Sequence, residues 1–96
     1  MDGVPVEFQI EPLEDHGYLA AIRGGAQRAE VEFRATPDVM EALGIHDAAE
    51  QCAVRETAAF LCDHQPVIDL PPLIDLEDVA AAYDDYIEEL RRRLRR

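Results

Sequence analysis

Alternating apolar and polar residues mark three strands in the first part of the chain. Apolar side chains fall on every second position in Val4–Ile10, Tyr18–Ile22 and Ala29–Ala35, and in the first and third runs the intervening positions are largely polar. A period of two is typical of strands that bury one face. The pattern predicts a three-stranded antiparallel β-meander over residues 4–36.

Two segments rich in turn-forming residues separate these runs. In Glu14–Gly17 we expect Gly17 to take a positive φ, and Gly24-Gly25 is typical of a tight hairpin. A meander connected in this way has one apolar face, which helices must cover.

Capping residues predict a pair of helices over residues 37–64. Thr36 followed by Pro37 is a typical helix start, and Gly44 is a typical C-cap, so the first helix is short. Asp47 and Glu50 have the spacing of a capping box. The helix that they begin should end near His64, ahead of Pro66. Its broad apolar face is formed by Cys52, Ala53, Thr57, Phe60, Leu61 and His64, extended by Val54, Ala58 and Cys62.

An apolar, proline-bearing segment over residues 65–74 follows. It reads as an extended connection against the core, and Val67–Leu70 could add a short edge strand. Asp75 then caps a long C-terminal helix over residues 75–96, with Ile74 and Val79 spaced as a hydrophobic staple. This helix carries an amphipathic stripe of Leu76, Val79, Tyr83, Tyr86 or Ile87, Leu90 and Leu94. The stripe could dock on the domain or form a seam with a second copy.

These elements predict one α+β domain over residues 1–96: a meander, two helices, a proline-rich extended segment and a C-terminal helix. A chain of 96 residues is long enough for a single core. Its alanine- and arginine-rich composition is typical of a GC-rich bacterial genome.

The distribution of charge adds one feature to this picture. The net charge is −12, but five of the nine basic residues lie in Arg91–Arg96; the first 90 residues hold 21 acids against four arginines. An acidic body repels phosphates, which argues against nucleic acid as a partner. The arginine tail suits a helix C-terminus and can pair with Glu88 and Glu89 one turn earlier. It could also contact an acidic surface or a phosphate backbone.

Candidate interaction residues gather on the last predicted helix. Tyrosine and arginine are common at interface hot spots. We therefore expect a protein partner, or a homodimer through this helix, to use Tyr83, Tyr86, Leu90, Arg91, Arg92, Arg93, Arg95 and Arg96.

Signals for other chemistry are weak. Without Ser or Lys the chain has no Ser nucleophile, Schiff-base Lys or P-loop Lys. Cys62-Asp63-His64 could suggest a zinc half-site or Cys-His catalysis, yet Cys52, His16 and His46 complete no regular ligand spacing. The acids Asp84, Asp85, Glu88 and Glu89 favour a solvated face over a metal site. We expect no catalytic residue, metal or cofactor.

The compartment is expected to be the cytoplasm. The N-terminus has no secretory signal pattern, and no window is apolar enough to span a membrane. Cys52 and Cys62 would lie about 15 Å apart along one helix, too far for a disulfide, and free thiols agree with a reducing environment.

One family resemblance can be stated. The strands Val6–Glu11 and Gly17–Ala21, a third strand, a long helix and Leu70-Pro71-Pro72 resemble the core of the HicB-like antitoxins. The chain departs from that pattern by a short helix at Asp38–Leu43 and lacks the family's Gly-Thr or Gly-Asp step. The resemblance, which covers the first 72 residues, implies an antitoxin-like regulator. A nucleic-acid-linked regulator of this kind would use the separate tail, Arg91–Arg96. The residues themselves favour a small acidic, non-enzymatic interaction or regulatory module, and a small enzyme with a carboxylate or Cys-His site is a third hypothesis.

Overall fold

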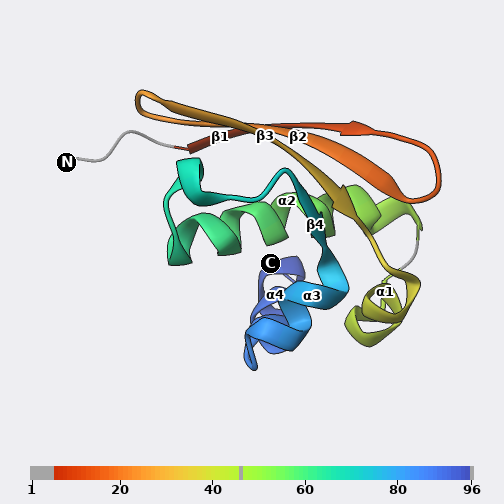
Figure 1. Ribbon diagram of the computed structural model, residues 1–96. Coiled ribbons are helices and arrows are strands. Elements are labelled where there is room, and N and C mark those ends of the chain that lie inside the picture. Colours follow the sequence, from red (N-terminus) through yellow and green to blue (C-terminus); the bar gives the residue numbers. More distant parts are fainter. Residues whose placement is uncertain (1–5, 46, 96) are drawn as a thin grey trace.

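The protein, described here by a computed structural model, is a sheet covered on one face by helices (Figure 1). The structure describes residues 6–45 and 47–95. The predicted α+β class is confirmed. The elements are β1 (Val6–Pro12), β2 (Gly17–Gly24), β3 (Gln27–Arg34), α1 (Pro37–Leu43), α2 (Asp47–His64), the 3-10 helix η1 (Val67–Asp69), β4 (Leu73–Asp75), α3 (Leu76–Ala82) and α4 (Tyr86–Leu94).

The sheet has the strand order β1-β2-β3-β4, and its first three strands form the predicted antiparallel meander. Strand β4 is parallel to β3, with Ile74 opposite Phe33. The edge strand suggested for Val67–Leu70 is therefore misplaced, because that segment contains η1 and the strand follows the two prolines. Pro72 has no N–H but accepts from the Glu32 amide at 2.8 Å, which brings the chain alongside β3.

The turn between β1 and β2 differs from the prediction. Asp15 and His16 take positive φ values of 57° and 62°, whereas Gly17 does not. Asp and His are among the few non-glycine residues that enter this region with any frequency. Lack of space favours glycine at position 17, because a Cβ there would make a tight contact of 3.2 Å with the Glu14 carbonyl oxygen.

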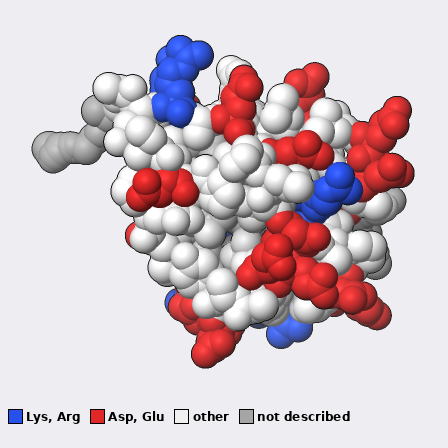
Figure 2. Space-filling view, viewed as in Figure 1, with Lys and Arg blue, Asp and Glu red and all other residues white. Residues whose placement is uncertain are grey.

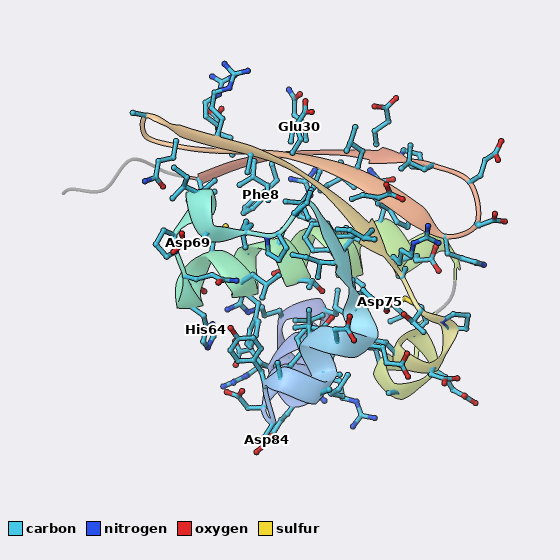
Figure 3. All side chains as sticks on the ribbon, viewed as in Figure 1. Phe8, Glu30, His64, Asp69, Asp75 and Asp84 are labelled. Atoms are coloured by element: carbon cyan, nitrogen blue, oxygen red, sulfur yellow. The ribbon has the colours of Figure 1, made fainter. Side chains whose placement is uncertain are left out.

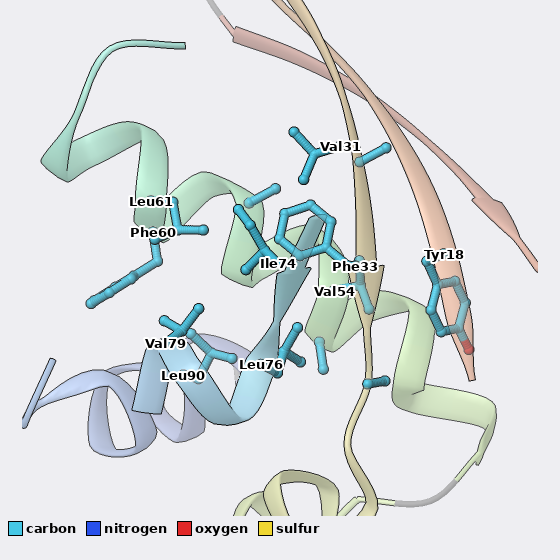
Figure 4. Packing of buried hydrophobic residues seen from close by; sticks show 14 of the residues in the cluster. Tyr18, Val31, Phe33, Val54, Phe60, Leu61, Ile74, Leu76, Val79 and Leu90 are labelled. Atoms are coloured by element: carbon cyan, nitrogen blue, oxygen red, sulfur yellow. The ribbon is translucent and has the colours of Figure 1, made fainter. Parts of the chain in front are cut away.

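The core lies between the sheet and the helices. Figure 3 shows Phe8 on the helix side of the sheet and Glu30 on the opposite, solvent side. The alternation predicts the buried face of β2 and β3, except that Ala29 is only partly buried. The buried residues pack against apolar side chains from the helices (Figure 4), and those of the two strands are Tyr18, Ala20, Ile22, Val31 and Phe33. The labelled residues of this core are Tyr18, Val31, Phe33, Val54, Phe60, Leu61, Ile74, Leu76, Val79 and Leu90.

Helix starts and ends largely follow the capping signals. Pro37 begins α1 and Gly44 ends it with a φ of 70°. Thr36 holds the N-cap position, but its hydroxyl donates to the Asp75 carboxylate instead of capping its own helix. Asp75 accepts from the Glu77 amide at 2.9 Å, so its predicted N-cap role is confirmed. These contacts place the starts of α1 and α3 side by side.

The C-terminal segment is two helices rather than one continuous helix. Tyr83 is extended, with φ −125° and ψ 111°, and α4 starts at Tyr86. One helix over residues 75–96 would be about 33 Å long, close to the 35 Å length of the whole molecule. The break folds the stripe back, so that residues of both α3 and α4 pack into the same core.

Strand β1 is an edge strand, and α2 reaches its backbone. Gln51 donates to the Ile10 carbonyl oxygen at 3.1 Å, and Arg55 donates to the Phe8 carbonyl oxygen at 3.4 Å. Helix α2 is thus tied to the sheet by polar contacts at one edge as well as by its apolar face. Among the described residues no helix is both long enough and apolar enough to cross a lipid bilayer.

Candidate binding site at Glu50

The predicted arginine tail is bound largely to its own domain. Arg91 donates to the Ala42 carbonyl oxygen at 3.1 Å from Nε and 2.6 Å from Nη2, which ties α4 to α1. Arg92 pairs with Glu89. Arg95 is exposed, and Arg96 lies outside the described residues.

Arg93 has the most contacts of these arginines. It donates to Glu89 at 2.9 Å, as the sequence spacing predicts, and to Asp63 at 3.0 Å, with Glu56 at 3.8 Å. Its guanidinium also lies 5.9 Å from the centre of the Phe60 ring. The Arg93 hydrogen bond, followed by the nearby arginine charges, lowers the pKa of Glu89. These contacts fix the end of α4 against α2.

The candidate interface residues on α4 are mostly internal. Tyr86 and Leu90 are fully buried, so they belong to the core rather than to a contact surface in this fold. Tyr83 is partly buried, with its ring edge-on to Phe60 at 5.3 Å. Of the two alternatives for the apolar stripe, the structure shows docking on its own domain.

The cysteine and acidic candidates do not converge on a site. Among the described residues no group of three or more His, Cys, Asp or Glu side chains could hold a metal ion. Cys52 is exposed instead of lying on the apolar face. Burial, and secondarily Asp63, raises the pKa of Cys62, which disfavours a reactive thiolate. His64 contacts the Phe60 carbonyl oxygen at 2.8 Å, and His46 lies outside the described residues.

The structure instead reveals a buried carboxylate near the start of α2. Glu50 is 5% exposed. The Tyr18 hydroxyl donates to its Oε1 at 2.7 Å, and His16 Nδ1 lies 3.0 Å from Oε1 and 2.9 Å from Oε2. A carboxylate can only accept, so the proton of this contact is on Nδ1. The three side chains come from the β1–β2 turn, β2 and α2.

A cavity of about 480 Å³ lies beside this group. Its volume falls within the range typical of small-ligand sites, roughly 300–1,000 Å³. It is bounded by the β1–β2 turn, by α1 and by the connection after α1. The residues that line it are His16, Pro37, Met40, Glu41, Gly44, Ile45 and Glu50.

The positive φ of His16 belongs to this site. A glycine would adopt that backbone conformation at lower cost. The side chain that occupies the position is half exposed and reaches the buried Glu50 carboxylate. The turn thus spends conformational free energy to place an imidazole at the cavity, which is a common arrangement at functional sites.

A second buried polar pair joins α2 to α4, through Thr57 and Tyr86. Thr57 donates to the Ala53 carbonyl oxygen at 2.7 Å, so the Tyr86 hydroxyl, 2.7 Å away, donates to Thr57. Both residues are fully buried. Burial raises the pKa of Tyr86 to about 12.

The Glu50 site was not identified from the sequence. The sequence places Glu50 at the N3 position of a capping box, which is normally exposed. One signal points to it: Tyr18 lies on the buried face of its strand, and a buried tyrosine hydroxyl needs a partner. The partner comes from a residue 32 positions away, which spacing rules for single elements do not reach.

The surface near the cavity is acidic. Figure 2 shows acidic side chains gathered over α1 and α3, where few basic side chains are seen. Residues from the first turns of both helices contribute, and Glu41 adds a further carboxylate to α1. The contributing acids are Asp38, Glu41, Glu77 and Asp78.

No protein-family model matches the sequence, and comparison with the curated proteins and with the solved structures gives no match either. The resemblance to the HicB-like antitoxins therefore stays a prediction based on the residues quoted above. Function has to be inferred from the site itself.

Proposed function

We propose that this chain is a non-enzymatic interaction module that binds a protein partner with a basic surface. The observation that carries the proposal is the cavity beside Glu50. It combines a buried carboxylate, an exposed carboxylate at Glu41 and apolar walls on a chain of net charge −12. A concave site with a few convergent polar groups is the usual form of a binding site.

The charge of the chain supports a basic partner. Surfaces of opposite sign accelerate encounter and suppress partners of the same sign. The acids of α1 and α3 lie on two neighbouring helices, of which α1 lines the cavity, so an approaching cationic surface would meet favourable potential there. A regulatory module that recognises one partner needs this selectivity.

The bonding of the arginine tail weighs against nucleic acid as the partner. Arg91, Arg92 and Arg93 each bond to groups of this domain. Contact with phosphate would compete with these bonds for the guanidinium groups and would bring a polyanion towards an acidic body. An antitoxin-like role through the tail is therefore less well supported than binding through the acidic cavity.

The chemistry of the cavity favours binding over covalent catalysis. His16 held by Glu50 resembles an oriented general base. However, the described residues that line the cavity include no Ser, Thr, Cys or Lys to act as a nucleophile. We expect the module to work in the cytoplasm, in agreement with its two free cysteines.

The proposal is tested by affinity capture followed by a binding measurement. The purified chain is immobilised, and an unrelated protein of similar size and net charge serves as the control for ion exchange. We expect the chain, but not the control, to retain a basic protein that binds with defined stoichiometry in calorimetry and more weakly at high salt. A retained partner without a basic surface, or retention equal to that of the control, would contradict the proposal.

A further inference from the structure

The walls of the Glu50 cavity include an apolar side and an acidic side, and His16 lines the cavity where it contacts Glu50. Pro37, Met40 and Ile45 give an apolar side, whereas Glu41 and Glu50 give an acidic one. The depths of the two carboxylates also differ, because Glu50 is buried and Glu41 is exposed. A ligand that enters would therefore meet apolar contacts along its length and negative charge both inside and at the rim.

We propose that this cavity receives an arginine or lysine side chain of the basic partner, an inference that rests on the proposed function. Both side chains combine an aliphatic stem with a cationic head, and both bury the stem on apolar surface when the head finds a polar partner. The stem would lie against Met40 and Ile45. The head would contact the carboxylates of Glu41 and Glu50.

Glu50 can accept a further donor in this arrangement. An ionised carboxylate has about four acceptor directions. Among the described residues, two donor groups contact it, the Tyr18 hydroxyl and His16 Nδ1. These contacts fix the carboxylate in place before a ligand arrives, and such preorganisation lowers the ordering cost of binding.

Other occupants fit the cavity less well. An anion would meet the carboxylates of Glu41 and Glu50 and the net charge of the chain. A purely apolar side chain would leave the acidic wall desolvated without a partner. A second copy could offer its exposed Arg95, but the two acidic bodies would repel each other.

The experiment uses the full chain, labelled with ¹⁵N, and two short probes. One is acetyl-Gly-Gly-Arg-Gly-Gly-amide, and the other carries citrulline in place of arginine, which keeps the shape and removes the charge. Amide shifts in NMR spectra locate and quantify binding. We expect shifts concentrated at Tyr18, Met40–Ile45 and Glu50, and about tenfold weaker binding of the citrulline probe.

Two matched variants identify the carboxylates involved. Glu41→Gln and Glu88→Gln each remove one charge from an exposed glutamate on a helix, but only Glu41 lines the cavity. We expect Glu41→Gln to weaken binding of the arginine probe by about threefold to tenfold, and Glu88→Gln to change it by less than about twofold. Glu50→Gln should weaken it further; if that variant fails to fold, the Glu41 and Glu88 pair still decides the question.

The possible outcomes separate the cavity from the proposed function. Equal binding of the two probes, shifts away from the cavity, or equal effects of Glu41→Gln and Glu88→Gln would overturn the cavity proposal. A doubled particle mass that depends on Arg95 would assign the site to a second copy and would overturn it as well. If the captured partner binds wild type and Glu41→Gln equally, the proposal of an interaction module is supported and the proposal for the cavity is wrong.

Discussion

Helix α2 buries two polar side chains two turns apart, and each contacts a tyrosine. Thr57 and Tyr86 form a neutral pair that the core encloses completely. Glu50 and Tyr18 form a charged group that also includes a half-exposed histidine and borders a cavity. The first arrangement does no more than satisfy buried hydroxyls. The second keeps a carboxylate where a ligand could reach it, which is why we assign function to that end of the helix.

The largest expected effect tests Thr57 and Tyr86, called here the closed pair because the core encloses both side chains. Tyr86→Ala should lower the free energy of unfolding by about 3–5 kcal/mol, because it removes a fully buried aromatic ring and leaves a cavity. Chemical denaturation measures this loss. Tyr83→Ala, at a partly buried position three residues earlier, serves as the control and should cost clearly less. Equal losses at the two positions would mean that the stripe does not dock as described.

The second-largest effect is a loss of stability at alkaline pH, which also arises from the closed pair. The folded-state pKa of Tyr86 is raised from 10.0 to about 12, so its contribution to stability is complete below pH 10 and is lost as pH rises through 12. The loss should reach roughly 2–3 kcal/mol. Denaturation from pH 9 to pH 12 should show a shallower decline for Tyr86→Phe than for wild type. Parallel declines would argue against the burial of this hydroxyl.

Double mutants should distinguish the closed pair from the group at Glu50, through changes of about 1–3 kcal/mol in the free energy of unfolding. Thr57→Val leaves the Tyr86 hydroxyl buried without its acceptor, and adding Tyr86→Phe should recover most of that loss. In the group formed by Glu50, Tyr18 and His16, Glu50→Gln should cost a similar amount of stability. Adding Tyr18→Phe should not restore that stability, because His16 still faces the altered side chain. Restoration at both sites would remove the distinction drawn between them.

The smallest expected effect concerns the turn that places His16. His16→Gly relieves a positive φ but loses the contact with Glu50, so its stability should stay within about 1 kcal/mol of wild type. His16→Ala loses the contact and keeps the strained backbone, so it should be less stable than the glycine variant by roughly 1 kcal/mol. Thermal unfolding compares the two. A glycine variant no better than the alanine variant would show that the turn is not strained.

Local patterns predicted the meander, the start of α1 and the caps at Gly44 and Asp75. Each of these depends on residues close together in the sequence. The alternation of β3 is clear enough that its burial follows directly. What local patterns could not show is which distant elements meet. The Thr36 hydroxyl was expected to cap α1, but the approach of β4 gives it the Asp75 carboxylate instead.

The break in the C-terminal helix has the same kind of cause. The apolar spacing of residues 76–94 fits one long helix equally well. Two shorter helices form because folding the stripe back at Tyr83 buries Tyr86 and Leu90 in the core. Glu50 was missed because its partners, Tyr18 and His16, lie on the first hairpin. The need of the buried Tyr18 hydroxyl for an acceptor is the one signal in the sequence that points to it.

The bonds from Gln51 and Arg55 to strand β1 bear on how the protein behaves when it is concentrated. An edge strand with unpaired carbonyl groups can recruit a strand from another molecule and start a fibre. Here two such carbonyl oxygens, on Phe8 and Ile10, already accept from α2. A neighbouring chain would have to displace these donors before it could add a strand. The helix that builds the core thus also occupies two of the acceptors through which this edge could pair with another molecule.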